Sequence, residues 1–131
     1  MDTGYLLDSN VIIGYLAGRI PNSGMQIVSA IVDQTPHISV ISQIEVLRHN
    51  DTPESDAILD GFITASVIHS LSHAVVQRTI ELCKHSKIKL PDAIIAATAL
   101  TENFILVTRN IDDFKHIADL KLLNPWDNPN R

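Results

Sequence analysis

Four acidic residues occupy similar places along the chain, and their side chains could bind a divalent metal ion. Asp8 directly follows a short apolar run, and Glu45 and Asp113 come shortly after two others. Asp92 follows Pro91 at the start of the most apolar helical pattern in the sequence. Because carboxylate oxygens are the ligands that Mg²⁺ and Mn²⁺ prefer, these four residues are the candidate catalytic and metal-binding side chains.

Carboxylates that hold a divalent ion would support the hydrolysis of phosphodiester bonds. A bound metal lowers the pKa of its water so that hydroxide is available near neutral pH, and a second metal about 3.5–4 Å away would stabilise the leaving oxygen. Carboxylates gathered in one place repel one another, and helix capping gives no reason to gather them, whereas a metal site does. The predicted chemistry is therefore metal-assisted hydrolysis without a side-chain nucleophile.

Helix capping is the competing explanation, and it accounts for each acid taken alone better than catalysis does. Glu45 has Ser42 three residues before it, which is the spacing of a capping box, and Asp113 stands in the same relation to Asn110. The other two acids would cap a helix or complement the positive end of its dipole. Only the four acids considered together favour a metal site.

An alternation of strands and helices would bring the acids together. Strands are predicted at residues 5–7, 37–40, 66–69, 104–107 and 121–123, and helices at 9–17, 25–32, 42–49, 53–63, 72–86, 91–100 and 110–116. This pattern predicts an α/β fold, a single domain over residues 1–131 with a mostly parallel sheet of four or five strands and helices on both faces. Strand ends and helix starts meet at one edge of such a sheet, where ligands bind.

The composition and charge narrow the class of protein. Hydrophobic residues make up 45% of the chain and charged residues 19%, as in a protein with a packed core. The formal net charge of −5 counts against nonspecific binding to nucleic acid, although bound divalent ions would reverse the local field. With one cysteine, no signal-peptide pattern and apolar runs too short to cross a bilayer, the sequence predicts a cytoplasmic protein without membrane attachment.

Other catalytic patterns are missing from the sequence. The five glycines form neither a P-loop nor a Gly-x-Gly-x-x-Gly pattern, and no Gly-x-Ser-x-Gly elbow is present. The six histidines do not have the spacing of a zinc site. His69 and His73 lie on either side of a predicted strand–helix junction, and both are expected at the surface.

Four segments resemble the signature segments of the PIN-domain family, and most closely those of VapC-type toxins from bacterial toxin–antitoxin pairs. The segments are LLDSNVII (6–13), SVISQIEVL (39–47), LPDAIIAATA (90–99) and LVTRNIDDF (106–114). They follow the order of the family and span nearly the whole chain. The resemblance implies a parallel sheet between helices, an Mg²⁺- or Mn²⁺-dependent endoribonuclease acting on RNA, inhibition by a cognate antitoxin protein, and a homodimer.

The resemblance also implies which acids bind the metal. Asp8, Glu45 and Asp92 match the three most regular acidic ligands of the family. The fourth position stays open, because Asn110 is neutral where the family has Asp or Asn. We expect Asp113 to supply the missing charge and Asp112 to face solvent.

Small polar and basic residues near the acids could assist them. The small polar positions of the family match Asn10, Ser42 and Thr108, which would orient ligands or waters, although helix capping explains them nearly as well. Asn110, at the Asp-or-Asn position, could assist in the same way. Arg109 is the candidate for contact with RNA phosphates. Lys84 and Lys87 fit better as cations at the C-terminal end of a helix.

Two other functions compete with this interpretation. A phosphotransfer receiver or phosphatase also uses an Asp after a strand together with Mg²⁺, but it would need a Lys at the end of a late strand, where this chain has Thr108 and Arg109. A binding module that keeps the fold without catalysis is favoured by the acidic net charge and by the neutral Asn110, and disfavoured by the intact acids.

Overall fold

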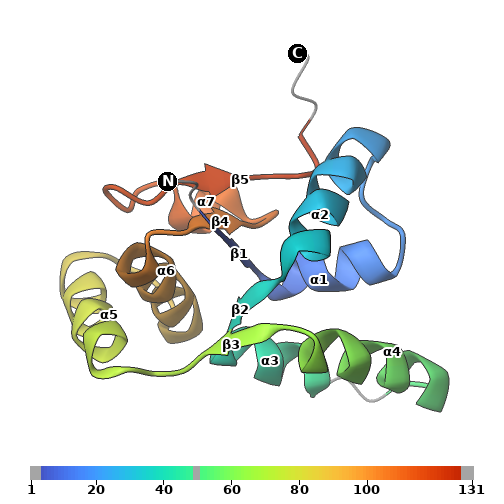
Figure 1. Cartoon of the computed structure of the whole chain (residues 1–131). Coiled ribbons are helices and arrows are strands. Elements are labelled where there is room, and N and C mark those ends of the chain that lie inside the picture. Colours follow the sequence, from blue (N-terminus) through green and yellow to red (C-terminus); the bar gives the residue numbers. More distant parts are fainter. Residues whose placement is uncertain (1–3, 49–50, 128–131) are drawn as a thin grey trace.

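The computed structural model describes residues 4–48 and 51–127, and within them each of the first three strands is followed by two helices (Figure 1). The strands are β1 (Tyr5–Leu7), β2 (His37–Ser39), β3 (Val67–His69), β4 (Ile105–Val107) and β5 (Leu122–Leu123). The helices are α1 (Ser9–Leu16), α2 (Asn22–Gln34), α3 (Val40–Leu47), α4 (Pro53–Thr64), α5 (His73–His85), α6 (Leu90–Glu102) and α7 (Ile111–Phe114).

The strands form one parallel sheet in the order β3-β2-β1-β4-β5. The central strand β1 pairs with β2 and β4, so that Leu6 lies opposite both His37 and Leu106. All strand ends therefore point to the same edge of the sheet. The predicted α/β fold with a mostly parallel sheet is confirmed, and every pairing in the described residues is parallel.

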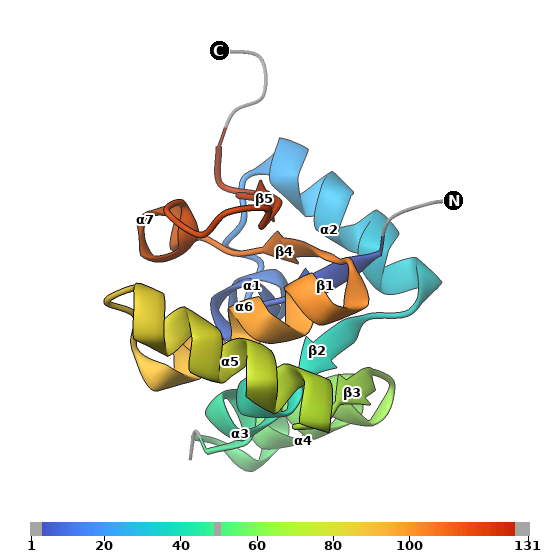
Figure 2. The same ribbon diagram turned by 90° about the vertical axis from the view of Figure 1, so that its left-hand side faces the viewer.

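Helices cover both faces of the sheet, with α5 and α6 on one side and α1 and α2 on the other (Figures 1 and 2). Neighbouring residues of a strand point to opposite faces. Leu7 belongs to one buried cluster with Val11 of α1 and Val28 of α2, whereas Leu6 belongs to another with Ile95 of α6. These two apolar clusters fix the helices, and hence the acids at the starts of α1 and α6, against the ends of the strands.

Helix α6 is the most deeply buried helix because it lies between the sheet and α5 (Figure 2). Seven consecutive residues, Ala93–Ala99, are buried, as expected for a helix that is apolar on all sides. The helix ends at Glu102 and is capped by Asn103, whose φ of 57° is the left-handed conformation common at helix C-termini. This packing holds the first turn of α6, which carries Asp92, in a rigid position.

Helix α3 starts two residues earlier than predicted. The backbone of Ser39 is extended, and its Oγ accepts a hydrogen bond from the Ile41 amide at 3.1 Å, so that Ser39 caps a helix beginning at Val40. The apolar Val40 favours a strand that continues to residue 40. The predicted end of this helix at His49 lies outside the described residues.

Other boundaries also differ from the predictions. Helix α2 begins at Asn22 instead of residue 25, and the last helix covers only Ile111–Phe114 of the predicted 110–116. The expectation that His69 lies at the surface is wrong, because it is half-buried in β3 beside His37. None of the described helices combines the length and the hydropathy that crossing a bilayer requires.

Candidate active site

Asp8 lies at the end of the central strand, where it caps α1 and is only 4% exposed. Its Oδ1 accepts a hydrogen bond from the Ser9 amide at 2.8 Å. Its Oδ2 accepts one from Thr108 Oγ1 at 2.8 Å and one from Asn10 Nδ2 at 3.1 Å. Asp8 can therefore cap α1 with Oδ1 and belong to a polar site through Oδ2.

Thr108 and Asn10 join the loop after β4 to the start of α1. Asn10 Nδ2 also donates to Thr108 Oγ1 at 3.4 Å, and Asn10 Oδ1 accepts from the Arg109 amide at 3.0 Å. Thr108 Oγ1 accepts from the Asn110 amide at 3.1 Å. The Asn110 side chain makes no capping hydrogen bond, so the weak capping box predicted for Asn110 and Asp113 is not formed.

Glu45 lies in the second turn of α3, because that helix starts at Val40. The predicted capping box of Ser42 and Glu45 is therefore wrong. The Glu45 side chain instead accepts a hydrogen bond from Ser9 Oγ at 3.1 Å. Sequence analysis missed Ser9, although its place next to Asp8 in the first signature segment could have marked it. Ser42 is fully buried, and its Oγ has no hydrogen-bond partner in the described part of the chain.

Asp92 and Asp113 share a pocket of about 300 Å³. Asp92 is half-buried in the first turn of α6, and Asp113 is exposed on α7. Asp112 also borders this pocket, but its side chain is 90% exposed and forms an ion pair with Lys115 at 3.0 Å. The expectation that Asp112 faces solvent is confirmed.

Burial is the main cause that raises the pKa of Asp8 to about 6. The negative charges of Glu45 and Asp92 act in the same direction, and the hydrogen bonds from Thr108 and Ser9 act against it. Asp8 therefore holds its proton more tightly than an exposed carboxyl group does.

Burial likewise raises the pKa of Asp92, followed by the charges of Asp113 and Glu45, while Lys89 opposes the shift. The structure thus links the four predicted acids in a chain of electrostatic contacts, in which Glu45 and Asp92 act on Asp8, and Glu45 and Asp113 act on Asp92. Arg109 does not neutralise them through a hydrogen bond or ion pair found among the described residues. Its guanidinium carbon lies 4.9 Å from the centre of the Trp126 ring.

The donor set suits a hard divalent cation. It consists of carboxylate oxygens at one edge of the sheet, and a cation would offset the repulsion that contributes to the raised pKa values of Asp8 and Asp92. Within residues 4–48 and 51–127, no three acids, histidines or cysteines converge closely enough to form a ready-made metal cluster. The residues fit Mg²⁺ or Mn²⁺ by their chemistry and their shared location.

Comparisons with known proteins identify the family. The sequence matches the PIN domain over residues 5–120. No curated protein matches the chain by sequence. Among solved structures, a chain of VapBC2 from Rickettsia felis, bound to a DNA fragment from its promoter, is 29% identical with a TM-score of 0.75, and the match covers 94% of this chain and 98% of that one.

Two further structures have the same fold. A toxin–antitoxin complex from Klebsiella pneumoniae is 26% identical with a TM-score of 0.74, covering 95% of this chain and 99% of that one. DNA-bound VapBC from Salmonella typhimurium is 21% identical with a TM-score of 0.78 and the same coverages, 95% and 99%, and shows the fold alone. The chain therefore belongs to the PIN-domain family, and it is similar to the VapC-like members of that family.

Proposed function

We propose that this protein is a metal-dependent endoribonuclease and the toxin of a VapBC-type toxin–antitoxin system. The observation that carries the proposal is the buried Asp8 at the end of the central strand, whose pKa is raised to about 6 and which is electrostatically coupled to Glu45 and Asp92. Carboxylates with shifted pKa values in one location mark functional sites. Membership of the PIN-domain family supports a nuclease.

In this proposal Asp8, Glu45, Asp92 and Asp113 hold Mg²⁺ or Mn²⁺. The metal, when bound, supplies hydroxide near neutral pH for attack on the phosphodiester. Asp113 is chosen over Asp112 because its charge acts on Asp92, whereas Asp112 pairs with a lysine and faces solvent.

Other residues of the chain position the ligands. Thr108 and Asn10 hold one oxygen of Asp8, and Ser9 holds Glu45 across the gap between α1 and α3. Arg109 is exposed beside the site and stacks on Trp126, which leaves its charge available to a phosphate of RNA.

Two protein partners belong to the proposal. A cognate antitoxin is supported by the similarity to a toxin–antitoxin complex and to VapBC2. A homodimer is supported by exposed apolar side chains on α3, β3 and α5, on the loop before α5 and at the start of α6. These side chains, here called the apolar strip, are Ile44, Leu47, Ile68, Leu71, Val76, Ile80 and Leu90. Monomeric proteins rarely expose large contiguous apolar surfaces.

We also propose that the protein is located in the cytoplasm.

Cleavage by the purified protein tests the proposal. The wild type, Asp8→Asn, Asp92→Asn and the control Asp112→Asn are incubated with structured RNA or single-stranded DNA, with Mn²⁺, Mg²⁺ or EDTA. We expect internal cleavage of RNA by the wild type and the control only with metal. In Asp8→Asn and Asp92→Asn the activity should fall by at least about 10–100-fold. Loss of a residue that only hydrogen-bonds to a metal ligand already has an effect of this size.

The comparison between variants decides the outcome. Equal cleavage by the wild type and by Asp8→Asn would trace the activity to a contaminating nuclease and refute the proposal. Cleavage of DNA alone would refute the assignment to RNA. Absence of cleavage by folded wild type in either metal would favour a binding module that has kept the fold.

A further inference from the structure

A second group of side chains that could bind a ligand lies away from the carboxylates. His37 of β2 and His69 of β3 are both half-buried, and Nδ1 of His37 lies 3.0 Å from Nε2 of His69. The two residues are 32 positions apart in the sequence, so only the pairing of β2 with β3 brings them together. Neither belongs to a signature segment of the family.

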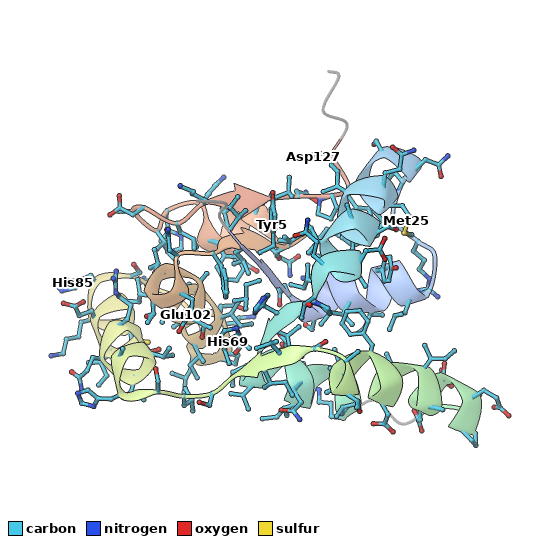
Figure 3. The ribbon with its side chains drawn as sticks, viewed as in Figure 1. Tyr5, Met25, His69, His85, Glu102 and Asp127 are labelled. Atoms are coloured by element: carbon cyan, nitrogen blue, oxygen red, sulfur yellow. The ribbon has the colours of Figure 1, made fainter. Side chains whose placement is uncertain are left out.

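Glu102, the last residue of α6, carries a charge that acts on His37. Figure 3 labels His69 and Glu102, which lie between β3 and the end of α6. Asp92 stands ten residues earlier on the same helix, which at about 1.5 Å per residue puts it about 15 Å away. The histidine pair is therefore separate from the carboxylate site.

Phe104 covers the histidine pair. Its ring centre lies 5.0 Å from that of His37 and 5.2 Å from that of His69. This arrangement depends on Gly4, because a Cβ at that position would lie 2.5 Å from the Phe104 ring. The aromatic cover restricts the imidazole rings and reduces the entropy that binding a ligand would cost.

The geometry suits a transition metal that accepts nitrogen ligands. A hydrogen bond between the two rings accounts for the 3.0 Å separation when one nitrogen carries the proton. In a tetrahedral zinc site with bonds of about 2.0–2.1 Å, two ligand nitrogens lie about 3.3–3.4 Å apart. The rings would therefore need to separate by a few tenths of an ångström and to turn, so that both nitrogens face the ion instead of each other. Imidazole nitrogen suits zinc, whereas Mg²⁺ prefers oxygen ligands.

We propose that His37 and His69 form a zinc site that joins the edge strand β3 to β2, with Glu102 as a third ligand and water completing the coordination. Glu102 is exposed, so its side chain is free to turn toward the pair. In the described residues no third ligand already stands in place, and binding would bring it there. The sequence spacing that argued against zinc could not show this pair, because its members come from different strands.

Zinc titration of the full chain tests this proposal. The wild type, His37→Gln and the control His73→Gln, an exposed histidine on α5, are titrated by calorimetry in millimolar Mg²⁺ to keep the carboxylate site occupied. We expect the wild type and the control to bind zinc alike. His37→Gln should bind it more weakly by at least about 10–100-fold, the range for losing even an outer partner of a metal ligand.

Nuclear magnetic resonance of the wild type tests zinc binding at the histidine pair without relying on the folding of any variant. Zinc should shift the ring resonances of His37 and His69 and leave those of His73 and His85 unchanged. Equal zinc affinity in His37→Gln and His73→Gln, or unshifted rings of His37 and His69 in saturating zinc, would overturn the proposal and leave the pair as a hydrogen bond. Neither result depends on nuclease activity, so the proposed function is tested separately.

Discussion

At the scale of single residues, Asp8 shows how one side chain serves both the fold and the site. It caps α1 through Oδ1 and accepts hydrogen bonds from Thr108 and Asn10 through Oδ2. Burial disfavours the ionised form of Asp8, so the charged carboxylate lowers the stability of the folded protein. If Asp8 binds a metal ion as proposed, the bound cation would relieve this destabilisation.

The raised pKa predicts a specific dependence of stability on pH. The folded state holds the Asp8 proton up to a pH of about 6, whereas the unfolded chain loses it near 3.8. The protonated Asp8 therefore stabilises the folded state fully below pH 3.8, and this contribution is lost as the pH rises through 6. At 1.36 kcal/mol per pKa unit, the free energy of unfolding should fall by about 3 kcal/mol in total. Asp8→Asn should flatten this part of the curve.

Urea unfolding in EDTA between pH 4 and pH 7.5 checks this prediction. Asp112→Asn is the control, because its carboxylate is exposed and paired with Lys115. The prediction would be wrong if the free energy of unfolding fell by the same amount over this pH range in Asp8→Asn and in the wild type. Burial would then not raise the pKa of Asp8. The test needs no metal and no substrate.

At the scale of elements, the start of α3 decides where Glu45 points. Because Ser39 caps the helix, Glu45 lies in its second turn and faces Ser9 of α1. A helix starting after Ser42 would have made Glu45 part of its own cap. The boundary therefore matters for the site as well as for the fold.

Two serine substitutions distinguish these helix starts. Ser39→Ala should lower the free energy of unfolding by about 1 kcal/mol, within a range of about 0.5–2, because it removes the cap. Ser42→Ala should leave stability unchanged or raise it, because the Ser42 Oγ is buried without a partner in the described residues. Chemical denaturation measures both, and a larger loss in Ser42→Ala would contradict the observed start of α3.

At the scale of the whole molecule, the apolar strip and the carboxylate site share two elements, α3 and α6. Helix α3 carries both Glu45 and the exposed Ile44, and Leu90, 60% exposed, stands two residues before Asp92. A dimer formed through this strip would bury apolar surface close to the acids of each copy.

A charge placed in the strip should separate such a dimer. Ile80→Glu puts a carboxylate among apolar side chains, whereas the control Arg78→Glu changes an exposed residue about 160° farther around α5. We expect analytical ultracentrifugation to find the wild type and the control as dimers and Ile80→Glu as a folded monomer. A monomeric wild type, or a dimer in all three, would exclude this interface.

The sequence by itself determined the class of the fold and the set of acids to consider. Hydrophobic periodicity and turn residues are local properties, so they indicated the strands, most of the helices and the α/β arrangement that the parallel sheet confirms. The places of Asp8 and Asp92 beside their apolar runs followed from the same patterns. Family resemblance pointed to the same acids.

Only the tertiary structure decided which polar side chains meet. The bond between Ser9 and Glu45 joins residues 36 positions apart, and the pairing of His37 with His69 depends on the register of β2 against β3. Strand register and side-chain rotamers cannot be predicted from spacing along the chain, because both are set by packing against residues distant in sequence. The raised pKa of Asp8 has the same origin, because burial belongs to the folded molecule and not to the residue.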